Sequence, residues 1–74
     1  MPDKDWEGRA KGLLKAELKR RNMTYAQLVA RLAEQGVRED ERNLRNKVAR
    51  GKFTAAFMLQ CFDAIGAQTI RLGE

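Results

Sequence analysis

The side chains best suited to recognising another molecule are concentrated in residues 40–52, which read DERNLRNKVARGK. If this segment is a helix, with 100° between successive residues, Leu44 and Val48 form a narrow apolar stripe. The residues on the opposite side are Arg42, Asn46, Ala49 and Arg50, with Asn43 and Arg45 on the shoulders. Arginine and asparagine form bidentate hydrogen bonds with guanine and adenine in the major groove, and a small methyl group fits against thymine. The pattern predicts a DNA recognition helix; the alternative is an exposed helix face that is charged only for solubility.

Both ends of this helix carry the residues that such ends require. Asp40 can accept hydrogen bonds from the free amides of the first turn, and Glu41 adds negative charge at the positive end of the helix dipole. Gly51 can adopt the left-handed conformation that ends a helix. We predict that base edges are contacted by Arg42, Asn43, Arg45 and Asn46. We predict that phosphates are contacted by Arg50 and Lys52, at the end of the helix.

Length and charge restrict the class of protein. Seventy-four residues suit a single domain, residues 1–74, whose small core would be stabilised by a partner chain. The net charge of +5 and the pI near 9.9 favour a polyanionic partner. No stretch is long enough to span a membrane, and Met1–Asp5 lacks the apolar core of a signal peptide. We therefore expect no membrane partner and a cytoplasmic, nucleoid-associated location.

The residue types argue against catalysis. Cys61 is the single cysteine and there is no histidine, so the chain can form neither an internal disulfide nor a structural zinc site. The adjacent carboxylates of Glu39–Glu41 point apart at a helix start, which disfavours a metal site. There is no activated nucleophile and no Gly-rich phosphate loop. We predict that the protein is not an enzyme and uses no cofactor, no metal and no small-molecule substrate.

Apolar residues at helical spacing predict three further helices. After residues 1–5, which we expect to be frayed, the first helix covers about 6–21 and the second 24–35. The fourth runs from about 55 to 65 after Thr54, a candidate N-cap. Basic residues crowd the end of the first helix, where they can complement the helix dipole or contact phosphate; these are Lys15, Lys19, Arg20 and Arg21.

The second helix begins with a capping box formed by Thr24 and Gln27. The free amides at such a helix start can also hold a phosphate, and exposed tyrosine and glutamine side chains extend that contact. We predict both roles for Thr24, Tyr25 and Gln27.

The fourth helix is apolar on more than one side, as expected of a helix that is buried on two sides. Its second side could pack in the core of the single chain or against a partner subunit, and the sequence leaves both open. Residues 68–72 alternate polar and apolar, which predicts a short β-strand that pairs with the same strand of a second subunit. The residues assigned to a dimer interface are Phe57, Cys61, Ala64, Thr69, Ile70 and Leu72. Cys61 could also be a reactive thiol, but no base is near it in the sequence and the helix around it is apolar, which favours a small buried hydrophobe.

This order of elements resembles the helix-turn-helix domain of the Cro and phage-repressor type over roughly residues 13–66. The matching residues are MTYAQL at 23–28 and Arg50-Gly51-Lys52 after the third helix. The resemblance implies a dimer on a pseudo-palindromic DNA site, with the third helix contacting bases and the front of the second contacting the backbone. The chain differs from that pattern in its longer second helix, in the acidic Glu39–Glu41 and in Ala49, where a glutamate is frequent. The run NLRNKVARGKF also resembles a small family of uncharacterised bacterial domains.

The sequence therefore predicts an all-α, four-helix, helix-turn-helix domain with a short C-terminal strand. We expect a small homodimeric protein that binds double-stranded DNA and regulates transcription. The alternative is a protein-interaction module, an adaptor or antitoxin-like subunit, that uses the apolar helix 54–65. RNA binding is a third interpretation, but the aromatic residues are better explained by packing than by stacking on bases.

Overall fold

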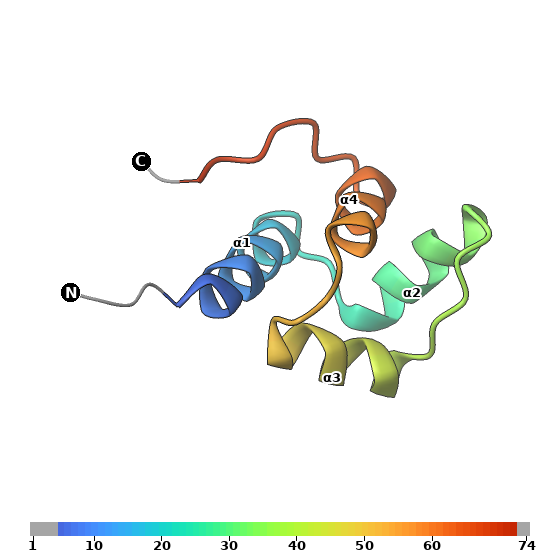
Figure 1. The fold of residues 1–74 in the computed structure, drawn as a ribbon. Coiled ribbons are helices and arrows are strands. Elements are labelled where there is room, and N and C mark those ends of the chain that lie inside the picture. Colours follow the sequence, from blue (N-terminus) through green and yellow to red (C-terminus); the bar gives the residue numbers. More distant parts are fainter. Residues whose placement is uncertain (1–4, 73–74) are drawn as a thin grey trace.

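The computed structural model describes residues 5–72, and these residues fold into four α-helices (Figure 1). The helices are α1 (Trp6–Arg20), α2 (Tyr25–Glu34), α3 (Glu41–Arg50) and α4 (Ala55–Ala64). The all-helical fold and each predicted helix are confirmed. No helix in residues 5–72 combines the length and the apolar character that crossing a membrane would need. The predicted fraying of residues 1–4 lies outside the described residues.

Each helix begins on a side chain that accepts a hydrogen bond from the backbone amide three residues further on. These capping residues are Asp5, Thr24, Asp40 and Thr54. At α2 the capping box is complete, because the Gln27 side chain also accepts from the Thr24 amide at 2.8 Å. Each cap satisfies amide groups that have no partner within the helix, so the ends of the helices are fixed by local sequence.

The core lies where the apolar stripes of the four helices meet. Helix α3 packs against α1 and α2, and α4 packs against α1 and α2. The buried side chains are Leu14, Leu18, Leu28, Leu32, Leu44, Val48, Phe57, Cys61, Phe62, Ala64 and Ile65. Helix α3 lies at the edge of the molecule (Figure 1) and contributes only Leu44 and Val48 to the core, so most of its side chains face outward.

The predicted C-terminal strand is not present in residues 68–72. A strand needs a neighbouring strand to pair with, and the described part of the chain contains none. The segment instead runs back over α1 (Figure 1), where Ile70 and Leu72 line an apolar hollow beside α1 and α4. The Arg9 guanidinium donates a hydrogen bond to the Leu72 carbonyl, so this backbone group is bonded by a side chain rather than by a neighbouring strand.

Three of the residues assigned to a dimer interface lie in the core. Phe57, Cys61 and Ala64 are buried within the single chain, so they offer no surface to a second subunit in this fold. The reason is that α4 passes between α1 and α2 and is covered on both of its apolar sides. Of the two interpretations of this helix, packing in the core of the single chain is correct for these residues.

Candidate nucleic-acid interface

Helix α3 has the two faces that its sequence predicted. Leu44 and Val48 are completely buried and anchor the helix to α1 and α2. The opposite face is exposed to solvent and consists of Arg42, Asn46, Ala49 and Arg50. We call this exposed face the crest of α3. Within residues 5–72, no hydrogen bond or ion pair involves the side chain of Arg42, Asn46 or Arg50. The donors of the crest are therefore available to another molecule.

The shoulder of α3 that faces α2 is occupied by Arg45. Its guanidinium forms an ion pair with Glu41, one turn earlier, at 2.6 Å. The same guanidinium lies over the ring of Tyr25, 5.5 Å from the ring centre, at the first residue of α2. Such a cation–π contact adds to the ion pair, so Arg45 links the start of α2 to α3.

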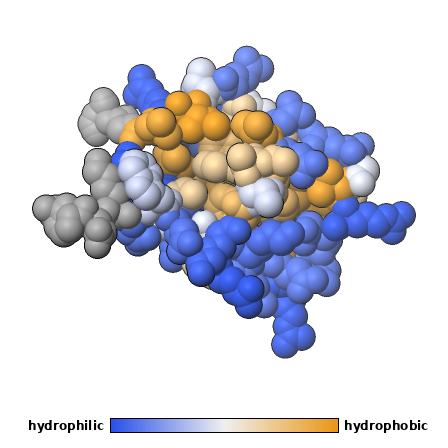
Figure 2. Space-filling view, viewed as in Figure 1, coloured by the Kyte–Doolittle hydropathy of each residue, from blue (hydrophilic) through white to orange (hydrophobic). Residues whose placement is uncertain are grey.

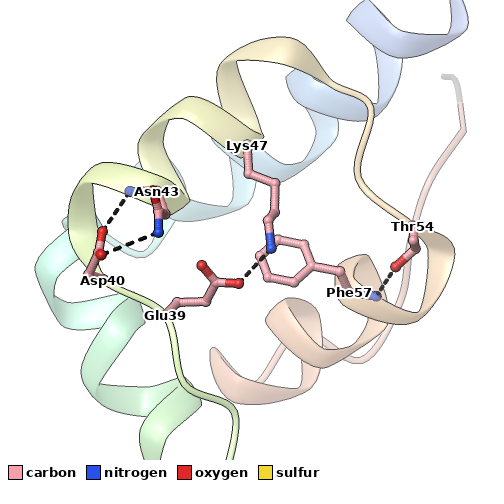
Figure 3. A network of polar contacts seen from close by, with 6 residues as sticks. All are labelled: Glu39, Asp40, Asn43, Lys47, Thr54 and Phe57. Carbon is pink, nitrogen blue, oxygen red and sulfur yellow. Dashed lines mark hydrogen bonds and ion pairs between the residues drawn. The ribbon is translucent and has the colours of Figure 1, made fainter.

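The other shoulder of α3 is occupied by Asn43 and Lys47 (Figure 3). Asp40 accepts hydrogen bonds from the backbone amide of Asn43 at 2.7 Å and from its side-chain amide at 3.3 Å. Lys47 forms a 2.5 Å ion pair with Glu39 and places its ammonium group 4.5 Å from the ring centre of Phe57 in α4. Asn43 therefore completes the cap of α3, and Lys47 links the connection before α3 to α4.

A shallow hollow runs along this second shoulder. Its lining consists of Arg38, Glu39, Asp40, Asn43, Asn46, Lys47, Arg50 and Lys52. The lining carries four cationic side chains and two carboxylates. Because both carboxylates already bind groups of α3, the hollow favours an anion. Arg38 and Lys47 were absent from the predicted site residues. Helical spacing from Asn43 could have indicated Lys47, whereas Arg38 precedes the helix and has no periodic signal.

A second hollow lies between the end of α1 and the starts of α2 and α3. Its lining consists of Lys15, Leu18, Lys19, Met23, Thr24, Tyr25, Glu41 and Arg45. The structure thus brings two of the predicted phosphate residues, Thr24 and Tyr25, next to cations of α1 and α3. Both partners of the capping box are engaged, since Thr24 Oγ1 accepts from the Gln27 amide at 3.1 Å. Their capping role is therefore established by geometry, and a phosphate would add to it.

The end of α3 is held against the first turn of α1. Gly51 is buried and has a φ of 69°. A Cβ atom at this position would lie 2.2 Å from the Glu7 carbonyl oxygen, so the close approach and the left-handed backbone both require glycine. The following Lys52 lies 4.0 Å from the Glu7 carboxylate and is otherwise exposed. The backbone of Gly51 therefore holds the end of α3 close to the first turn of α1.

Cys61 is not part of a reactive site. Its thiol is completely buried in α4. The pKa of Cys61 is raised from 9.0 to about 12, mainly because the thiol is buried and in part because of the nearby Glu39 carboxylate, while Lys47 acts in the opposite direction. A thiol with a raised pKa is a poor nucleophile at neutral pH, which agrees with the interpretation as a small buried hydrophobe. Within residues 5–72, no group of three or more His, Cys, Asp or Glu side chains is arranged so that it could hold a metal ion.

The face opposite the crest of α3 is apolar. The large exposed hydrophobic residues are Trp6, Leu59, Ile70 and Leu72, and all four line one hollow between α1, α4 and the C-terminal segment. In Figure 2 the apolar side chains gather in the upper part of the view, where the C-terminal segment lies, and the lower part along α3 is hydrophilic. Of the predicted interface residues, Ile70 and Leu72 lie on this apolar surface. Thr69 is also exposed, but it lines a different hollow, with Arg20 and Arg71.

Comparisons with known proteins place the chain in a family. No curated protein and no solved structure matches it. The family described as Domain of unknown function (DUF6471) matches residues 6–70, which include all four helices and the crest of α3. The chain therefore belongs to the DUF6471 family of domains of unknown function.

Proposed function

We propose that this protein binds double-stranded DNA as a homodimer and regulates transcription, with α3 in the major groove. The observation that carries the proposal is the crest of α3, where Arg42, Asn46 and Arg50 are exposed and Leu44 and Val48 anchor the helix beneath them. Arginine and asparagine are the side chains that form bidentate pairs with guanine and adenine. The order of the helices, with a capped second helix before a basic third helix, resembles the Cro and phage-repressor type of helix-turn-helix domain.

Contacts to bases and contacts to phosphates come from different parts of this surface. The predicted base contacts are Arg42, Asn43, Arg45 and Asn46. The predicted phosphate contacts are Thr24, Tyr25 and Gln27 at the start of α2, and Arg50 and Lys52 at the end of α3. The two hollows beside α3 add Arg38 and Lys47 on one side and Lys15 and Lys19 on the other. Cations on both sides of a helix suit the two phosphate backbones that border the major groove.

The charge distribution predicts strong dependence of binding on salt. Each lysine or arginine that neutralises a phosphate releases counterions, so affinity falls as salt rises. With few contacts in each subunit, a single domain binds weakly, and a dimer on two half-sites would raise the affinity. The apolar surface around Leu59, Ile70 and Leu72 lies away from α3 and could join two subunits without covering the crest.

The proposal is tested by fluorescence anisotropy on random-sequence duplex DNA at increasing salt. The test variant carries Arg42→Ala, Asn46→Ala and Arg50→Ala. The matched control carries Lys11→Ala, Gln60→Ala and Arg71→Ala, which removes the same charge and one amide from positions elsewhere on the molecule. We expect wild type and control to bind with a steep salt dependence and the test variant to lose most of its affinity. Equal binding by the two variants, or no binding by wild type, would contradict the proposal.

The second candidate function is a protein-interaction module. It is favoured by the cluster of Trp6, Leu59, Ile70 and Leu72, since a contiguous apolar surface is typical of a protein interface. Only Leu59 among these belongs to α4, so the surface is shared with α1 and the C-terminal segment. Leu59→Lys separates the two functions: it should abolish association with a partner or a second copy while single-subunit binding to DNA is unchanged.

A further inference from the structure

The acidic run at the start of α3, Glu39 to Glu41, has a specific geometric role. Glu39, Asp40 and Glu41 are consecutive, and each of them holds one side chain of α3. The pairs are Glu39 with Lys47, Asp40 with Asn43, and Glu41 with Arg45. The negative charge that distinguishes this connection is therefore used to engage polar side chains on both shoulders of the helix.

Arg45 is held from two directions. An exposed ion pair alone constrains an arginine only weakly. Here the Tyr25 ring contacts the same guanidinium that Glu41 binds, at 5.5 Å from the ring centre. Both contacts lie on the side of α3 that faces α2 and α1, where Arg45 and Glu41 line one hollow with Tyr25. These two contacts direct the guanidinium of Arg45 toward Glu41 and Tyr25 and away from the crest.

Asn43 is held in a similar way. Its backbone and side-chain amides both donate to the Asp40 carboxylate, which is the N-cap of α3. Asn43 therefore presents an amide that already has a partner (Figure 3). Arg42 and Asn46, by contrast, have no partner within residues 5–72 and lie one helical turn apart on the crest.

We propose that Arg42 and Asn46 are the specificity-determining residues of α3, and that Glu39–Glu41 keep Asn43, Arg45 and Lys47 as positioning residues that do not contact bases. This inference rests on the proposed DNA binding and changes two of the four predicted base contacts. The three carboxylates thus hold the side chains on the shoulders of α3, so that only side chains of the crest contact bases.

The spacing of the two free side chains defines the expected partner. Four residues of α-helix rise by about 6 Å, which corresponds to roughly two base-pair steps of about 3.4 Å. Arginine pairs with guanine through O6 and N7, and asparagine pairs with adenine through N6 and N7. The expected half-site in duplex DNA therefore contains a guanine and an adenine about two base pairs apart.

The test is a selection of preferred sites from a random-sequence duplex library, followed by affinity measurements on the selected duplex and on its single-base variants. Wild type is compared with Arg42→Ala, Asn46→Ala, Asn43→Ala and Arg45→Ala, and thermal melting establishes that each variant is folded. We expect Arg42→Ala to lose the preference for guanine and Asn46→Ala the preference for adenine, each by about tenfold or more. Asn43→Ala and Arg45→Ala should keep both preferences, with any loss of affinity equal on all duplexes.

A fifth variant, Glu41→Gln, tests directly whether the Glu41 carboxylate keeps Arg45 away from DNA. It removes one ion-pair partner of Arg45 and keeps the shape of the side chain. We expect tighter binding to all duplexes, a steeper salt dependence and weaker discrimination between the selected site and random DNA. Loss of a base preference in Arg45→Ala or Asn43→Ala, or unchanged discrimination in Glu41→Gln, overturns this inference while DNA binding itself stands. Absence of any duplex binding by wild type overturns the proposed function and this inference together.

Discussion

Helices α3 and α4 begin in the same way but have opposite surroundings. Each begins after a side chain that accepts from the third amide of the helix, Asp40 in α3 and Thr54 in α4. Helix α3 buries only Leu44 and Val48, whereas α4 buries four residues, Phe57, Cys61, Phe62 and Ala64. The exposed surface of α4 includes one large apolar residue, Leu59. Similar local signals thus produce a peripheral helix with a free polar face and a central helix that supplies more of the core.

This difference separates stability from recognition. A helix held by two buried residues can present the rest of its side chains to a partner without loss of core packing. A helix buried on two sides can accept few substitutions. In this protein the candidate recognition residues and the core residues are therefore almost entirely different sets, and each set can be changed without the other.

Leu44→Ala should have the largest effect on stability. Leu44 is completely buried and supplies half of the apolar anchor of α3, so its truncation should lower the free energy of unfolding by about 2–5 kcal/mol. Leu59→Ala in α4 is the matched control, because Leu59 is 59% exposed and its truncation should cost less than about 0.5 kcal/mol. Urea denaturation followed by circular dichroism measures both. Similar losses for the two leucines would refute the contrast between the helices.

Gly51→Ala should have the next largest effect on the free energy of unfolding. The left-handed conformation of a residue with a Cβ costs about 1–2 kcal/mol, and the clash with the Glu7 carbonyl adds about 1–3 kcal/mol. Gly36→Ala is the control, since Gly36 has a φ of 82° but open space around the position of a Cβ. Its substitution should carry only the backbone cost. If both variants melted at the same temperature, the close contact between α3 and α1 would not contribute to stability.

The smallest expected effect is the pH dependence that comes from Cys61. Burial raises the pKa of Cys61 to about 12 in the folded chain, so the folded state keeps a proton that the unfolded chain loses above about pH 9. The contribution of Cys61 to the free energy of unfolding is therefore fully present below about pH 9, and it decreases as the pH rises toward 12. Cys61→Ala should therefore lose less stability than wild type between pH 8 and pH 10.5, measured by urea denaturation. In the native wild type, iodoacetamide should modify the thiol only as fast as the chain unfolds; rapid modification at pH 8 would show that α4 is more open than described.

Much of the fold could be predicted from local sequence. The predicted caps Thr24, Asp40 and Thr54 and the apolar stripe of α3 are confirmed, because a cap or a stripe depends on residues three or four positions apart. The end of α3 is confirmed too, since Gly51 has a positive φ where the helix was expected to stop. The two faces of α3 follow from the same periodicity.

The errors all concern partners that are distant in sequence. The alternation in residues 68–72 indicated a strand, but the apolar side chains Ile70 and Leu72 line a hollow beside α1 and α4 instead. The second apolar side of α4 could not be assigned from the sequence, because its cover comes from helices that lie far away along the chain. In the candidate site, helical spacing could have indicated the local pairs Asp40–Asn43 and Glu41–Arg45. It could not indicate the contacts that come from other helices, Tyr25 with Arg45 and Phe57 with Lys47.

Local sequence sets where the helices begin and end, which residues of α3 lie opposite its apolar stripe, and the pairs Asp40–Asn43 and Glu41–Arg45, because these properties depend on neighbours within about one turn. Helix packing adds the contacts that hold Arg45 and Lys47 from outside α3. Tyr25 reaches Arg45 from another helix, and Glu39 and Phe57 reach Lys47 from the preceding connection and from α4. Because these contacts form only when the helices pack together, they could not be predicted from the spacing of residues within α3.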